Sequence, residues 1–204
     1  MNLKKATLFS IIGISYIFVF RTIATLFPDL FINLIVTRIN TLLSLFASLA
    51  IVVFYIYFYK DYVQKKQITL KNASLFAIIG SLAVLLLFLK DILVVFNLYV
   101  FRSHVLNIVA PWISSIFSLY FFIIFYKETL HNAQSNLKFA IFLAIIGSSI
   151  STLIRTFTLF NYFYSGKFKW LWDYSREFPI IFIPTFAFMF FTSFYFFLTF
   201  YKEQ

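Results

Sequence analysis

The sequence predicts an all-α integral membrane protein, in which six transmembrane helices form three tandem two-helix hairpins around a pseudo-threefold axis. Three observations lead to this fold class. Hydrophobic residues make up 62% of the 204 residues and charged residues only 12%, whereas soluble domains are near half apolar and a quarter charged. Six apolar stretches are long enough to cross a bilayer. Two short motifs each occur three times along the chain.

The composition also excludes several classes of protein. So much apolar surface cannot be buried inside one globule of this size, which excludes a soluble enzyme, a disordered tail and a secreted disulfide scaffold. The chain has no cysteine and only two histidines, His104 and His131. We therefore expect no thiolate chemistry, no metal site and no cofactor.

The six apolar stretches define the expected spans. A helix that crosses about 30 Å of hydrocarbon needs about 20 apolar residues. The qualifying stretches form one transmembrane domain over 1–204 and cover residues 6–27, 39–59, 73–95, 106–126, 139–160 and 178–201. The first begins with Lys4 and Lys5, as a signal peptide would. A similar sequence recurs twice later in the chain, and no cleavage site with two small residues one position apart follows the first stretch. We therefore expect a transmembrane span instead of a signal peptide.

The basic residues between the spans predict the orientation. The net charge is +10, from 17 basic and 7 acidic residues. Nine lysines fall on the side of the two termini and five basic residues on the other, which predicts a cell (inner or plasma) membrane protein with both termini cytoplasmic. This distribution suits a bilayer with anionic headgroups, and we expect no nucleic acid partner.

Glycines mark an internal repeat. Gly13, Gly80 and Gly147 are spaced by 67 residues, and each follows an Ile-Ile pair. Three lysines keep the same register, namely Lys4, Lys71 and Lys138. The repeat units cover about 3–69, 70–136 and 137–204. Because each unit crosses the membrane twice, all three have the same orientation, as in transporters built from parallel repeats.

A second motif ends each repeat. The sequence Phe-Tyr-Lys followed by an acidic residue occurs at 58–61, 125–128 and 200–203. The last copy is offset by 75 residues rather than 67, so about eight residues were inserted, most simply in the loop around 164–178. We expect the Tyr and Lys of this motif to anchor the helices at headgroup depth.

Small residues precede each repeated glycine on the same helical face. The expected packing residues are Ala6, Ser10, Gly13, Ala73, Ala77, Gly80, Ala140, Ala144 and Gly147. Small residues spaced in this way let two helix backbones approach closely in lipid. We expect a seam within the bundle; oligomer contact or helix sliding is the alternative.

Four charged residues fall inside the spans, toward the end opposite the termini. Arg21 and Arg155 occupy the same repeat position, and Lys90 and Asp91 lie two and three residues past that position in the second repeat. One interpretation is that these side chains extend to the membrane surface. The alternative is a basic cluster around the axis, with a net positive charge that would bind an anionic solute or lipid headgroup.

The last outer loop is longer than the others and is both aromatic and basic. Its candidate residues for a lid or a partner contact are Lys167, Lys169, Trp170, Trp172 and Arg176. A segment of this composition also suits the membrane surface. Since only the third repeat contains it, this loop is a natural place for an asymmetric function.

No catalytic motif occurs in the sequence, so we do not expect an enzyme. No nucleotide-binding motif occurs either, so active transport would need an energising partner subunit. Two classes of function remain. One is a small-solute or lipid-binding bundle of the channel or transporter type, which predicts a central cavity. The other is a structural or partner-binding membrane protein, such as an immunity, assembly or accessory subunit, which predicts a filled core.

Overall fold

The computed structural model describes residues 1–27, 29, 33–63, 68–96, 98, 104–130, 135–165 and 179–204. Helices account for nearly all of these residues, and no strand occurs among them. The six α-helices are α1 Leu3–Leu26, α2 Leu34–Tyr57, α3 Ile68–Val95, α4 His104–Thr129, α5 Ser135–Ser165 and α7 Pro179–Lys202. A π-helical segment, η2 Phe58–Val63, continues α2.

Local chemistry explains where the first two helices begin. The Asn2 side chain accepts a hydrogen bond from the backbone N–H of Lys5 at 3.0 Å. The Asn33 side chain accepts one from the N–H of Ile35 at 2.9 Å. Each asparagine thus satisfies a backbone donor that has no partner inside its helix.

The helices follow the predicted spans but extend past them. The helices α2, α3 and α5 each begin about one turn before the apolar stretch. The added turns carry polar residues, because a helix can continue into water as long as its backbone hydrogen bonds are satisfied. Pro111 and Pro184 lie inside α4 and α7.

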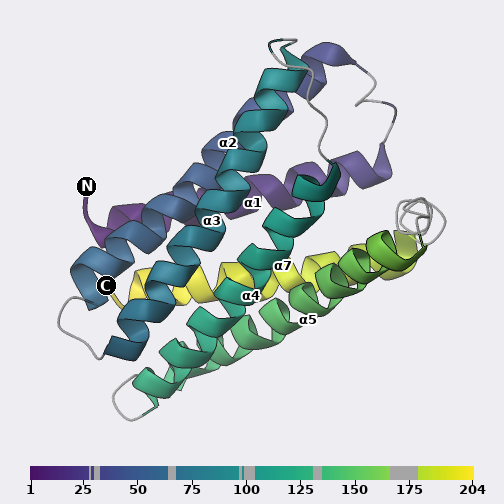
Figure 1. The fold of residues 1–204 in the computed structure, drawn as a ribbon. Helices are drawn as coiled ribbons and strands as arrows, with labels where there is room; N and C mark the ends of the chain where they lie inside the picture. The colour runs from purple at the N-terminus through teal and green to yellow at the C-terminus, as the bar shows by residue number, and fades with distance from the viewer. Residues whose placement is uncertain are drawn as a thin grey trace.

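The helices are arranged as a closed ring (Figure 1). Each packs against the helices that precede and follow it in the chain, and α7 packs against α1 to complete the circuit. The two termini lie at the same end of the bundle, where the Lys4 ammonium is 5.1 Å from the centre of the Tyr201 ring. We call this end the terminal end and the opposite one the distal end.

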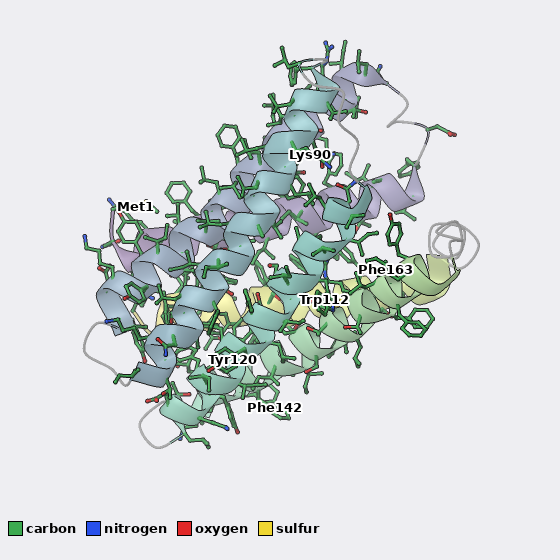
Figure 2. All side chains as sticks on the ribbon, viewed as in Figure 1. Met1, Lys90, Trp112, Tyr120, Phe142 and Phe163 are labelled. Carbon is green, nitrogen blue, oxygen red and sulfur yellow. The ribbon has the colours of Figure 1, made fainter. Side chains whose placement is uncertain are left out.

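All six α-helices are long and apolar enough to cross a membrane, over spans of 19 to 30 residues. Large hydrophobic side chains cover the outside of the bundle; Phe142 and Phe163, for example, project from α5 (Figure 2). The chain thus has the composition and the helix lengths of a multi-pass membrane protein.

Burial is concentrated toward the terminal end. Between the repeated glycines and this end, every helix carries several fully buried side chains. More than one turn beyond the glycines toward the distal end, the buried side chains that the structure describes are those of Thr41, Ile108 and Ala110. The ring is therefore filled at one end and less tightly packed at the other.

Candidate functional site

The three repeated glycines lie where the two helices of each hairpin meet. A Cβ added at Gly13 would be 3.0 Å from a backbone oxygen of α2, and one at Gly80 would be 3.0 Å from a backbone carbon of α4. At Gly147 an added Cβ would collide with Thr192 of α7. Contacts this short leave no room for a side chain, so glycine permits the close approach of each helix pair.

The small residues before these glycines are buried as well. Ala73 and Ala140 have no exposed surface, and Ala77 and Ala144 are 1% exposed. In the first hairpin, the Ser10 hydroxyl donates to the Ala50 carbonyl of α2 at 2.9 Å. The structure therefore places the whole small-residue stripe inside the bundle.

Six phenylalanines fill the middle of the terminal end. They are fully or almost fully buried, and they come in pairs one turn apart from α2 with η2, from α4 and from α7. We call them the aromatic core: Phe54, Phe58, Phe121, Phe125, Phe196 and Phe200. Their sequence positions have the same spacings of 67 and 75 residues as the Phe-Tyr-Lys motif.

Three of these rings contact one another directly. The ring centres of Phe58 and Phe125 are 5.2 Å apart, those of Phe58 and Phe200 are 5.6 Å apart, and those of Phe125 and Phe200 are 6.1 Å apart. We call these three residues the phenylalanine triangle. Such distances are typical of favourable aromatic pairs, so the triangle joins the second helices of all three hairpins.

A fourth ring covers the triangle on the side of the termini. Tyr62, in η2, has its ring centre 4.9 Å from that of Phe58, 5.7 Å from Phe125 and 6.0 Å from Phe200. At the end of α4 the equivalent residue is Thr129. The π-helical turn after α2 therefore supplies the ring that contacts all three members of the triangle.

The acidic residue of each Phe-Tyr-Lys motif binds the start of the other helix in its hairpin. The Asp61 carboxylate accepts from the N–H of Leu3 at 3.1 Å. The Glu128 carboxylate accepts from the Thr69 hydroxyl at 3.2 Å, near the start of α3. The Glu203 carboxylate interacts with the backbone N–H of Leu137 in α5. A carboxylate is favourable at the positive end of a helix, so each hairpin is fastened at its terminal end.

Glu203 has a perturbed ionisation. Burial raises the pKa of this carboxyl, and the hydrogen bond from Leu137 opposes the rise. Burial dominates because removing a charge from water costs more than one backbone hydrogen bond returns.

At the distal end, the structure brings Lys90 and Asp91 together. The Lys90 ammonium lies 3.2 Å from the Asp91 carboxylate, with side chains 16% and 39% exposed. The ammonium also donates to the Asn107 side chain of α4. Figure 2 shows Lys90 on the distal part of α3. This lysine is thus neutralised locally and joins the two helices of the second hairpin.

Arg155 lies on α5 in an exposed position. Its guanidinium donates to the Ser151 hydroxyl one turn earlier, at 3.3 Å. Arg155 lies on the same helical face as Ser148 and Thr152, which are half-buried. Arg155 and Lys90 lie on α5 and α3, which both pack against α4, and their grouping in one cluster stays a prediction.

Two predicted features lie outside the described residues. The backbone of Arg21 belongs to α1, but its side chain is not among those described. The same holds for the whole predicted lid or partner loop, with Lys167, Lys169, Trp170, Trp172 and Arg176. Their roles remain predictions.

Other polar contacts in the distal half join neighbouring helices. The Tyr16 hydroxyl donates to Asn40 of α2 at 3.3 Å. The indole N–H of Trp112 donates to Thr156 of α5 at 3.0 Å, and Figure 2 shows this tryptophan on α4. Hydrogen bonds of this kind hold helices together in an apolar solvent.

Sequence reasoning missed both the aromatic core and the carboxylate contacts. The repeat contained the information, because the equivalent phenylalanines and acids share its spacing. We interpreted the motif as a membrane anchor. Which residues meet across helices depends on helix rotation, and periodicity alone leaves that rotation open.

The described residues contain no group of three side chains that could hold a metal ion. No protein family, no curated protein and no solved structure matches this chain. The guide to its function is therefore the geometry of its own helices.

Proposed function

We propose that this chain is a polytopic, non-enzymatic cell-membrane protein of the channel or transporter type that binds an anionic ligand near its distal end. The ligand is a small anionic solute or a lipid headgroup, since both present the same oxyanion chemistry to an arginine. The lysines of the terminal end favour a cytoplasmic location for both termini.

The arrangement of the hairpins supports a bundle around a pseudo-threefold axis. Each hairpin has a glycine at the contact between its helices, a carboxylate at the start of its first helix and two phenylalanines in the aromatic core. These features recur at equivalent sequence positions. Three equal units that close into a ring are most simply related by rotation about one axis, along which a solute could pass.

One observation carries the ligand proposal: the Arg155 side chain is exposed on α5 although the residue lies within a span that is long and apolar enough to cross a membrane. An arginine inside a membrane span is costly unless it serves a function or reaches water. Arg21 has the same register on α1. Lys90 contributes less to an anion site, because Asp91 balances its charge.

A thermal-shift experiment on the detergent-purified chain tests this proposal. The probes are inorganic phosphate, sulfate and micelles doped with an anionic phospholipid. A ligand at about a hundred times its dissociation constant adds about 2.7 kcal/mol of stability. We expect one probe class to raise the Tm of the wild type and to have no effect on Arg155→Ala. The responding class distinguishes a solute from a headgroup.

The matched control is Arg38→Ala, which removes the same charge from the same end of the bundle. The Arg38 guanidinium donates to the Val95 carbonyl at 3.4 Å and lies 5.1 Å from the Phe96 ring centre, so it belongs to the contact between α2 and α3 and not to α5. We expect this variant to retain the full ligand shift. Equal shifts in the wild type and both variants, or no shift in the wild type, would contradict the anion site.

A structural or partner-binding role is the second candidate, and the aromatic core favours it. Six buried phenylalanines make the terminal half a filled core, which is the packing expected of a protein without a ligand of its own. Under this alternative no anionic probe shifts the Tm. The purified chain is then stabilised by a partner subunit instead.

A further inference from the structure

We infer that the phenylalanine triangle and Tyr62 form a gate, which closes the terminal end of the bundle to ions and opens when the hairpins tilt apart. This inference rests on the proposed function, because a gate needs a pathway. The inference goes beyond the proposed function because it names the four side chains that would block the pathway.

The position of the four rings is the first argument. The triangle contains one phenylalanine from the second helix of each hairpin, and its three sides are contacts of 5.2, 5.6 and 6.1 Å between ring centres. Phe58 and Phe125 have no exposed surface and Phe200 is 2% exposed. An apolar constriction of this kind blocks ions because water does not wet it.

The second argument is the asymmetry at Tyr62. Three equivalent tyrosines could not occupy one point on an axis, and the first hairpin alone supplies a ring there. Tyr62 contacts all three members of the triangle. It lies in η2, and π-helical turns are rare and frequent at functional sites. A return of η2 to α-helical geometry would change the direction of Tyr62 relative to the triangle.

The third argument concerns what can move. The glycine contacts and the carboxylate contacts both join helices of the same hairpin. Each hairpin is therefore tied internally, whereas the triangle and Tyr62 join different hairpins. Tilting whole hairpins separates these rings, at the cost of contacts between hairpins such as the hydrogen bond from Trp112 of α4 to Thr156 of α5, and leaves the contacts within each hairpin in place.

Anion flux through the full chain in liposomes tests the gate. The vesicles contain a halide-sensitive dye, and external iodide is the probe. We expect little flux from the wild type and roughly ten-fold more from Phe125→Ala and from Tyr62→Ala, the equivalent of about 1.4 kcal/mol off the barrier. Tyr62→Phe keeps the ring and should stay closed.

Phe76→Ala is the matched control. Phe76 also lies in an aromatic contact, 5.1 Å from the Phe117 ring centre, but on the seam between α3 and α4. This variant should stay closed. If Phe125→Ala does not fold, as judged by gel filtration, Tyr62→Leu replaces it, because leucine keeps apolar volume without contacting three rings.

Two outcomes would overturn the gate: folded triangle and Tyr62 variants that conduct no more than the wild type, or equal flux from Phe76→Ala. Adding Arg155→Ala to Tyr62→Ala separates the two proposals. Flux that persists in this double variant, with no ligand shift in the wild type, keeps the gate and contradicts the anion site. A ligand shift without flux in any variant keeps the anion site and contradicts the gate.

Discussion

Phe125 and Phe160 are the same residue type on neighbouring helices, yet the first has no exposed surface and the second is 57% exposed. Phe125 lies in the aromatic core of the terminal half, whereas Phe160 lies on the distal half of α5. Lipid is as apolar as either side chain, so hydrophobicity alone does not explain the difference. In a membrane, close packing and satisfied polar groups decide where a bundle is tight. The terminal half has both features, and the distal half has fewer buried contacts.

The largest expected effect on stability comes from replacing one phenylalanine in the terminal half, with one in the distal half for comparison. Phe125→Ala should cost about 3–5 kcal/mol, because it leaves a cavity among five other phenylalanines. Phe160→Ala should stay within about 0.5 kcal/mol of the wild type, as surface substitutions do. The free energy of unfolding in detergent micelles, from a sodium dodecyl sulfate titration, measures both. Similar losses in the two variants would mean that the halves are equally packed.

The glycine contacts mark the border between the halves and give the next largest effect. Gly80→Leu should cost about 1–3 kcal/mol, because its side chain would push α3 away from the backbone of α4. Gly80→Ala should cost less, since a single methyl group requires a smaller shift. The same titration ranks them, with Ala83→Leu, one turn along α3 and only half-buried, as the control. A tolerated leucine at Gly80 would mean that the helices are free to separate there.

A smaller effect is expected at the carboxylate that fastens the first hairpin. Asp61→Ala removes the acceptor for the N–H of Leu3 and should cost about 1 kcal/mol, as the loss of a helix cap does. Asp61→Asn keeps an oxygen acceptor and should recover part of this loss. Lys60→Ala, at the exposed neighbouring position, is the control. Asp61→Ala and Lys60→Ala with equal stability would assign Asp61 to the surface and not to the cap.

Much of the coarse fold could be predicted from the sequence. Bilayer thickness fixes the length of a span, so six apolar stretches gave six helices, with ends shifted by about a turn. The repeat also drew attention to Gly13, Gly80 and Gly147, which the structure places at the contacts within the hairpins. Composition and spacing are properties of the chain alone, and they are enough for these two conclusions.

The packing of side chains inside the bundle could not be predicted from composition and spacing. Phenylalanine occurs in every span, so composition alone does not distinguish Phe125, in the core, from Phe160, on the surface. The difference arises from how each helix is rotated toward its neighbours. Likewise, the sequence does not predict that Lys90 donates a hydrogen bond to Asn107 of the next helix. Which side chains meet depends on the rotation of each helix about its own axis, and a single sequence does not predict that rotation.

The smallest expected effect concerns pH, at the terminal end of the third hairpin. Burial raises the pKa of Glu203 in the folded chain, so the folded state holds this proton more tightly than the unfolded state does. Ionisation of Glu203 therefore lowers the free energy of unfolding as the pH rises, first through the pKa of this carboxyl in the unfolded state and then through its pKa in the folded state. In acid the carboxyl is protonated in both states and this loss of stability is absent. Glu203→Gln keeps an acceptor for the N–H of Leu137 without the charge. We expect it to be slightly more stable than the wild type near pH 7 and equal to it at about pH 3, below the ordinary pKa of a glutamate. Thermal unfolding across this range measures the difference, which stays small because Glu203 is largely exposed.

The opposite result would be a Glu203→Gln variant that is less stable than the wild type at neutral pH. It would mean that the ionised carboxylate stabilises the start of α5 by more than its burial costs. Glu203 would then act as Asp61 does, and the three hairpins would be fastened equally.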